Sequence, residues 1–173
     1  MFPYNGLNII STSKKLKAKD CRNLTLMNKL KVLFLCTGNS CRSQMAEGWT
    51  RHLKGDLIEA YSAGTQPKGL NPDAVQTMKE SGVDISSHSS QHIDEFAAEE
   101  LDWIVTVCGH ADETCPTFPG KTRVIHKGFD DPPALAVNAK SEAERLAPYR
   151  RVRDEIRAFV ETLPEYLNGV SNN

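Results

Sequence analysis

A cysteine and an arginine stand six residues apart after a short apolar run, a spacing that can bind and attack an anion. Val32–Leu35 has the length of a buried strand, and Cys36 and Arg42 follow it with a small polar loop between them. Backbone N–H groups of such a loop, together with the N-terminus of a following helix, can bind a tetrahedral oxyanion. The Arg42 guanidinium adds donors that suit the oxygens, and the positive field favours Cys36 as a nucleophilic thiolate. The loop consists of Thr37, Gly38, Asn39, Ser40 and Cys41, and Ser43 can open the helix.

Two further cysteines follow another strand of the sequence. Trp103–Val107 has the length of a buried strand, Cys108 comes directly after it, and Cys115 stands seven residues later in a polar stretch. Because the carboxyl ends of parallel strands meet at one edge of a sheet, we expect Cys108 to lie near Cys36. Three thiols in this arrangement can pass a disulfide from one to the next, which suits a reductase without a bound cofactor.

The cysteines allow other interpretations. Cys36 could be a buried structural residue, but the loop composition and Arg42 disfavour that reading. A zinc site formed by Cys36, Cys41, Cys108 and Cys115 is also conceivable, yet the gap of six residues between the last two exceeds the usual spacing of structural zinc ligands. A static disulfide is disfavoured because the chain shows no export signal.

Two adjacent carboxylates complete the set of reactive side chains. Asp130 and Asp131 precede the proline pair Pro132-Pro133, which favours a rigid loop rather than a helix. On its own the motif indicates only a turn. A carboxylic acid held over the oxyanion could protonate an oxygen that otherwise leaves as hydroxide.

Length and charge indicate a single globular domain. The chain has 173 residues and a net charge of -1, so it can bury a core and lacks the basic character of a nucleic-acid-binding protein. No segment approaches the ~20 apolar residues of a membrane-spanning helix, and we expect a cytoplasmic protein. Residues 1–28 read as a disordered extension or a misassigned start, residues 29–168 as the domain and residues 169–173 as a tail.

Strands and helices alternate along this domain. Leu57–Ser62 and Arg123–His126 read as further strands. The pattern predicts an α/β fold, a four-stranded parallel sheet with helices on both faces, and places the Cys36 loop at the carboxyl edge of the sheet. Helices are expected from Ser43 to Gly55, from Asn71-Pro72 to Gly82, and after a capping box at Ser141 to Glu144, where Pro148 divides or begins a final helix that carries Val152, Ile156, Phe159 and Leu163.

Taken together, the motifs resemble those of the thioredoxin-coupled arsenate reductases, which share the fold of low-molecular-weight tyrosine phosphatases. The resemblance runs from about residue 31 to about residue 163. It includes Cys36-Thr-Gly-Asn-Ser-Cys-Arg-Ser43, Ser62-Ala-Gly-Thr, Gly69-Leu-Asn-Pro72, Val107-Cys-Gly109, Cys115-Pro116, Gly128-Phe-Asp-Asp-Pro132 and Arg150-Arg-Val-Arg-Asp-Glu-Ile156.

The resemblance implies a role for each reactive side chain. Cys36 would attack arsenate held by the loop and Arg42, with Asp131 as the general acid. Cys108 would then attack Cys36, which releases arsenite, and Cys115 would resolve the resulting disulfide into a Cys108–Cys115 bond. Thioredoxin would reduce that bond as an external reductant, with no bound cofactor, and family precedent is a monomer. Asn39 and Ser43 match positions that hold the shape of the loop and hydrogen-bond the thiolate.

One departure from the family concerns potassium. Some relatives bind this ion through positions that match Asn39, Glu47, Ser62 and an aspartate, but Gln91 stands where the aspartate aligns. Since a hard cation prefers anionic oxygen ligands, we expect activity to change little when sodium replaces potassium.

Two other functions compete with arsenate reduction. A protein-tyrosine phosphatase would use Cys36, Arg42 and Asp131 alone, but phosphatases of this fold usually have an aromatic residue where Pro133 stands, and Cys108 and Cys115 would be unexplained. A non-catalytic oxyanion or metal sensor would need a partner-reading surface, and no basic stripe or DNA-reading helix supports it.

Overall fold

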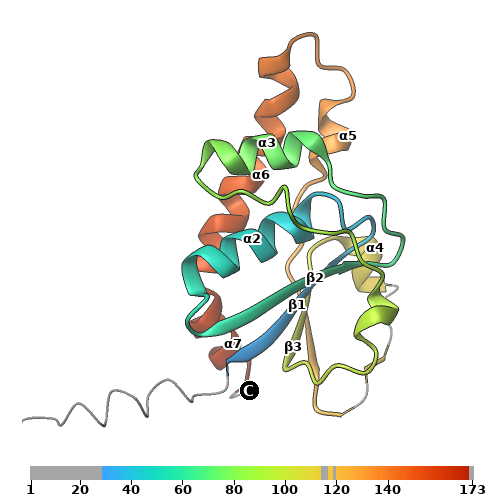
Figure 1. Ribbon diagram of the computed structural model, residues 1–173, viewed down its shortest axis with the longest axis vertical. Helices are drawn as coiled ribbons and strands as arrows, with labels where there is room; N and C mark the ends of the chain where they lie inside the picture. Colours follow the sequence, from blue (N-terminus) through green and yellow to red (C-terminus); the bar gives the residue numbers. More distant parts are fainter. Residues whose placement is uncertain (1–28, 114–116, 119, 172–173) are drawn as a thin grey trace, which may run out of the picture.

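Four parallel strands form a single twisted sheet at the centre of the molecule (Figure 1). The computed structural model describes residues 29–113, 117–118 and 120–171. The strands lie in the order β2-β1-β3-β4 and all neighbouring pairs are parallel, which confirms the predicted α/β class. Their bounds are Leu30–Cys36 (β1), Ile58–Gly64 (β2), Trp103–Thr106 (β3) and Arg123–His126 (β4).

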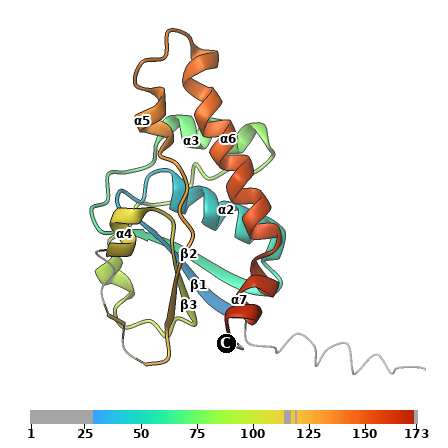
Figure 2. The ribbon, with the colours of Figure 1, turned by 180° about the vertical axis from the view of Figure 1, so that it is seen from behind.

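Helices cover both sides of this sheet. α2, α3 and α6 stack on one side, and the single turn η2 and the short α4 lie on the other (Figures 1 and 2). α5 and the first turns of α6 project away from the sheet beyond α3. The bounds are Arg42–Lys54 (α2), Pro72–Glu80 (α3), Ile93–Phe96 (η2), Gly109–Glu113 (α4), Pro132–Ala136 (α5), Glu142–Glu161 (α6) and Leu163–Ser171 (α7).

The core forms where α2 and α6 pack over β1. All residues of Val32–Leu35 are fully buried, and Met45 and Trp49 of α2 and Ile156 of α6 belong to the same apolar cluster. Burial of one such side chain contributes about 1.5–3 kcal/mol. The end of β1 is therefore held rigidly, and Cys36 is its last residue.

The carboxyl-terminal region differs from the prediction. Pro148 lies inside α6, which runs unbroken from Glu142 to Glu161, so it neither divides nor begins the helix. A proline within a helix costs about 3 kcal/mol, but burial of the neighbouring Leu146 and Tyr149 offsets this cost. Leu163 belongs to a separate helix, α7, which continues to Ser171 beyond the predicted domain end at 168.

The two other helix starts also differ in detail. The Ser141 hydroxyl accepts a hydrogen bond from Glu144 N at 3.2 Å, but the Glu144 carboxylate accepts from Lys140 N rather than from Ser141 N, so only half of the capping box forms. Asp130 and Asp131 lie in a loop, as predicted, but the helix α5 that begins directly after them was not predicted. Pro132 occupies its first helical position, where the missing N–H and fixed φ of proline are tolerated.

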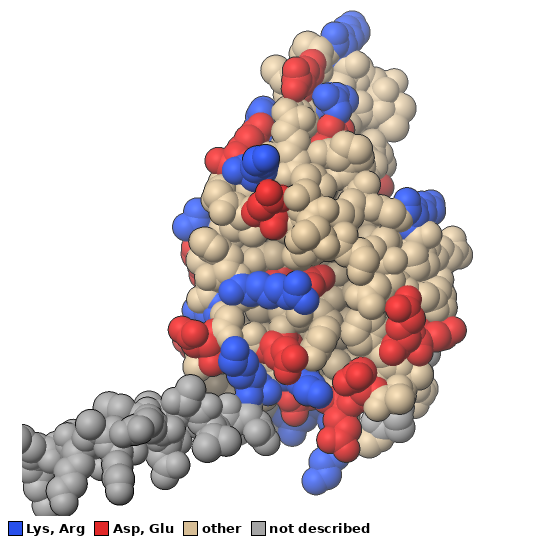
Figure 3. Space-filling view, viewed as in Figure 1, with Lys and Arg blue, Asp and Glu red and all other residues tan. Residues whose placement is uncertain are grey.

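The described residues show no membrane-spanning helix, and one face of the surface carries charges of both signs. Among them no helix is both long and apolar enough to cross a bilayer. On the face shown in Figure 3, basic and acidic groups are interspersed.

Candidate active site

The loop after Cys36 turns its carbonyl groups outward, into the neighbouring segment 65–71 and Ser90. Each of these oxygens accepts a hydrogen bond from a residue outside the loop, so the backbone conformation is fixed from behind. The bonds are Thr65 N to Cys36 O (3.3 Å), Gln66 N to Thr37 O (2.8 Å), Lys68 N to Gly38 O (2.9 Å), Asn71 N to Ser40 O (2.9 Å) and Ser90 Oγ to Asn39 O (2.9 Å).

The loop offers backbone amide groups near the Cys36 sulfur, and one of them donates to it directly. Asn39 N donates to Cys36 Sγ at 3.2 Å, and Ser43 Oγ lies 3.0 Å from the same sulfur. Within the described part of the chain, the N–H groups of Gly38, Ser40 and Cys41 have no hydrogen-bond acceptor. α2 begins at Arg42, so its positive end lies at the loop as well. Unpaired amides near a sulfur form a cradle for an anion.

Asn39 holds the loop in shape. Its φ is 42°, in the left-handed region that asparagine tolerates better than most residues, and its side chain is fully buried. The carboxamide nitrogen donates to Ser43 Oγ and to Ser62 Oγ, both at 2.9 Å, while its oxygen accepts from Gln91 N at 2.7 Å. Since Ser43 Oγ accepts from Asn39, its own proton is directed to Cys36 Sγ. Two donors therefore point at this sulfur, as suits a thiolate.

Gly64 allows the loop to approach the end of β2. It pairs with Cys36 in the sheet register, and a Cβ at this position would lie 2.7 Å from Thr37 O and 2.8 Å from Asn39 N. Any other residue would displace the loop.

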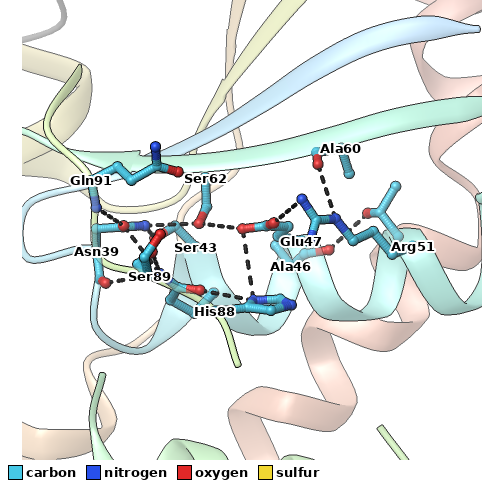
Figure 4. Close-up of polar contacts among 12 residues, drawn as sticks. Asn39, Ser43, Ala46, Glu47, Arg51, Ala60, Ser62, His88, Ser89 and Gln91 are labelled. Atoms are coloured by element: carbon cyan, nitrogen blue, oxygen red, sulfur yellow. Dashed lines mark hydrogen bonds and ion pairs between the residues drawn. The ribbon is translucent and has the colours of Figure 1, made fainter. Parts of the chain in front are cut away.

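A buried carboxylate lies behind the loop, on α2 (Figure 4). Ser62 Oγ donates to Glu47 Oε2 at 2.5 Å, and Arg51 Nη2 lies 2.5 Å from Glu47 Oε1. The three expected potassium positions Asn39, Glu47 and Ser62 are thus linked in one chain of hydrogen bonds. The side-chain amide of Gln91 donates to Glu95 at 3.3 Å.

Gln44 and His88 extend the network to the segment that follows α3. Gln44 Nε2 donates to both Asn39 O (3.2 Å) and Asn39 Oδ1 (3.0 Å), so its Oε1 must accept from His88 Nδ1 at 3.0 Å. Glu47 Oε2 lies 3.8 Å from the same ring nitrogen (Figure 4). Burial lowers the pKa of His88 below its ordinary value, which keeps the ring neutral at neutral pH. Sequence patterns did not reveal Gln44, because its contacts with His88 and Ser89 join residues that are distant in sequence.

Arg42 faces one of the two carboxylates. Its Nη2 lies 2.8 Å from Asp131 Oδ1, and its Nη1 donates to Phe129 O at 3.1 Å. Asp130 instead pairs with Arg151 of α6 at 2.8 Å. The structure thus brings Asp131 to the loop and directs Asp130 away from it.

A second thiol lies beside the loop. Cys108 follows β3, and its Sγ is 3.5 Å from the Thr37 hydroxyl. Cys36, Cys41 and Cys108 are all buried and unbonded as thiols. Burial strongly raises the pKa of Cys41, so that thiol stays neutral and serves as packing. Cys115 lies outside the described residues. The sequence places Thr37 in the loop but does not indicate that its hydroxyl contacts Cys108.

No metal-ligand cluster competes with this arrangement among the described residues, and a separate hollow lies at the far edge of the sheet. The described residues contain no group of three or more metal-ligating side chains. A hollow of about 670 Å³ lies at the opposite, amino-terminal edge of the sheet, where Lys31, Asp102 and Lys121 line it. Lys31 N already donates to the Asp102 carboxylate there, and neither a cysteine nor a histidine lines the hollow.

Comparison with known proteins identifies the family. The pattern of the family described as low molecular weight phosphotyrosine protein phosphatase matches residues 31–171. The chain is similar to the arsenate reductase of Halalkalibacterium halodurans, with 49% identity over 139 residues that make up 80% of this chain and 98% of that protein.

Solved structures agree with this assignment. An arsenate reductase in its reduced state superposes with a TM-score of 0.61 at 31% identity, over 80% of this chain and 98% of that one. The thioredoxin-dependent arsenate reductase of Corynebacterium glutamicum superposes with a TM-score of 0.62 over 87% of this chain and 71% of that one, and at 21% identity this likeness concerns the fold alone. The chain therefore belongs to the low molecular weight phosphotyrosine protein phosphatase family, in the branch whose members are arsenate reductases.

Proposed function

We propose that this protein reduces arsenate to arsenite and that thioredoxin regenerates it. The observation that carries the proposal is the combination of an anion-binding loop around Cys36 with a second thiol, Cys108, beside the same loop. A phosphatase needs only the first of these features. The names of the H. halodurans relative and of the solved structure at 31% identity, both arsenate reductases, support the same choice.

Binding of the substrate would begin with an exchange of partners at Arg42. The guanidinium now pairs with Asp131, and an arriving oxyanion would take over its donors together with the loop amides. Release from Arg42 would let Asp131 accept a proton, which a general acid must carry.

The first chemical step would join sulfur to arsenic. The Cys36 thiolate attacks the arsenic atom, an As–S bond forms, and one oxygen leaves as water after it receives the proton of Asp131. Arsenic remains in the pentavalent state, and the loop amides bear the negative charge of its other oxygens.

The second step would be the reduction. The Cys108 thiolate attacks Cys36 Sγ, the S–S bond forms, and the electron pair of the As–S bond remains on arsenic, which leaves as trivalent arsenite. The Thr37 hydroxyl, 3.5 Å from Cys108 Sγ, can hydrogen-bond the attacking thiolate.

The third step would use Cys115. Its thiolate attacks Cys108, which frees Cys36 and leaves a Cys108–Cys115 disulfide for the thioredoxin dithiol to reduce. The position of Cys115 in the sequence, seven residues after Cys108, supports this role.

We further propose that the protein works as a cytoplasmic monomer without a resident cofactor or potassium. Glu47, the anionic member of the potassium positions, already pairs with the Arg51 guanidinium, and Gln91 supplies no charge. Turnover should therefore stay the same when sodium replaces potassium at constant ionic strength.

The decisive experiment measures arsenate-dependent NADPH oxidation in the presence of thioredoxin and thioredoxin reductase. The intact protein should turn over steadily, whereas Cys115→Ser should complete a single turnover and stop. Hydrolysis of an aryl phosphate serves as the control, because it needs Cys36 but neither Cys108 nor Cys115. Continued turnover by Cys115→Ser would rule out the three-thiol relay.

A low-molecular-weight phosphatase activity is the second candidate, since the oxyanion loop and Asp131 suit phosphate monoesters equally well. Pro133 stands where an aromatic residue would grip a phenol ring, so we expect this activity to be weak. Good aryl-phosphate hydrolysis without arsenate turnover by the fully reduced protein would make the phosphatase the principal function.

A further inference from the structure

Lys68 lies across the oxyanion loop. Its backbone N–H donates to Gly38 O at 2.9 Å. A Cβ added to Gly38 would lie 3.8 Å from Lys68 Cδ and 3.9 Å from Lys68 Cγ, which are ordinary contact distances. The aliphatic part of the lysine therefore packs on the glycine of the loop, and the ammonium is only two bonds beyond Cδ.

The backbone around Lys68 is fixed on both sides. Gln66 N donates to Thr37 O and Asn71 N donates to Ser40 O, so hydrogen bonds to the loop flank the lysine. Pro67 restricts the chain just before Lys68, and Gly69, with a φ of 81°, supplies the left-handed turn just after it. The lysine is thus anchored at the loop rather than carried by a free surface segment.

The other charged groups near the loop leave the Lys68 ammonium available to bind an anion. The guanidinium of Arg42 is balanced by Asp131, and a thiolate on Cys36 would add a negative charge. An incoming arsenate or phosphate carries one to two further negative charges. In the described part of the chain, Lys68 forms no ion pair with a carboxylate, so its charge is available to an anion.

We propose that Lys68 is a substrate-recruiting residue, which draws tetrahedral oxyanions into the Cys36 loop and stabilises them there. This role rests on the proposed function only in that the loop binds such an anion. It concerns binding and not the chemical steps, because the side chain lies against Gly38 and nothing places it on the Cys36 sulfur.

The test measures anion binding directly. The fully reduced protein is treated with iodoacetamide, a neutral reagent, and alkylation of Cys36 is followed by peptide mass spectrometry at increasing concentrations of inorganic phosphate. In Lys68→Met the phosphate concentration that gives half protection should rise about tenfold, as expected for loss of a focusing charge. Lys68→Arg should restore protection to within about twofold of the intact protein.

A matched control separates the effect of Lys68 at the loop from the effect of removing a positive charge elsewhere in the molecule. Lys121→Met removes the same charge at the opposite edge of the sheet and should leave protection unchanged. In single-turnover reduction of arsenate, Lys68→Met should raise the half-saturating concentration of arsenate and leave the maximal rate nearly unchanged. Added salt should weaken protection in the intact protein more than in Lys68→Met.

The possible results distinguish the two proposals. Equal protection in Lys68→Met and the intact protein would overturn the role of Lys68 and leave the reductase untouched. A lower maximal rate with unchanged half-saturation would also overturn it, because the lysine would then act in the chemistry. Absence of phosphate protection in the intact protein would refute the oxyanion site itself, and with it both proposals.

Discussion

Asp130 and Asp131 are neighbours in the sequence, yet they face different parts of the molecule. Asp131 pairs with Arg42 at the loop, whereas Asp130 pairs with Arg151 on the exposed surface of α6. An exposed ion pair of the second kind contributes little to stability, about 0–1 kcal/mol. Only Asp131 lies at the loop, where the proposed function assigns it the proton transfer, so the pair forms a matched test of position.

Asp131→Asn should lower the rate of the first chemical step by about 10²–10⁴-fold, because the leaving oxygen loses its proton donor. Asp130→Asn should change that rate less than about threefold, since its partner is a surface arginine. Rapid quenching of a single turnover, with released arsenite as the measured product, determines the rate in both variants. Equal losses in the two variants would mean that the carboxylates act by holding the segment before α5 and not by proton transfer.

At the scale of elements, sequence patterns predicted most strands and helices but not the packing contacts between them. The apolar run before Cys36 and the Asn71-Pro72 start of α3 are local signals, and both elements are present as predicted. The unbroken α6 depends on the burial of Leu146 and Tyr149 against other elements, which a proline rule applied to Pro148 alone does not include.

The same limit applies to the site. Cys36, Arg42 and Ser43 were identifiable because one loop carries them, and Asp131 because of the motif around it. Ser90 and Lys68 contact the loop only because the fold brings them close to it, so no spacing in the sequence indicates them.

Gly64 is the point at which β2 meets the loop, and Gly64→Ala tests that contact. The added methyl group would lie within 3 Å of Thr37 O and Asn39 N, so the loop must shift. We expect arsenate turnover to fall by about 10²-fold, because misplaced positioning groups cost this much, with a smaller loss of stability. Gly169→Ala, where a Cβ meets nothing within 4 Å, is the control and should behave like the intact protein. A Gly64→Ala protein with full turnover would show that the loop tolerates displacement.

At the scale of the whole molecule, the hydrogen-bond network behind the loop links folding to pH. His88 donates to Gln44, which in turn holds Asn39, so the ring is part of the folded scaffold. Burial lowers the pKa of His88 in the folded state below the ordinary value of 6.5. The unfolded chain consequently binds a proton at this residue before the folded protein does, and folding loses free energy as the pH falls below about 6.5.

His88→Gln should remove this pH-dependent contribution to the free energy of unfolding. The glutamine side chain still offers an N–H donor to Gln44. We expect the free energy of unfolding in urea to fall more for the intact protein than for the variant between about pH 7.5 and about pH 5.5. The other histidines are common to both proteins, so the difference between the two curves isolates His88. The free energy of unfolding of the intact protein should therefore decrease relative to that of the variant as the pH approaches about 5.5. Only the intact protein must then either protonate a buried imidazole or keep it neutral below its ordinary pKa. Parallel curves would mean that Glu47, 3.8 Å from the ring, compensates the proton fully and that the network tolerates a charged His88.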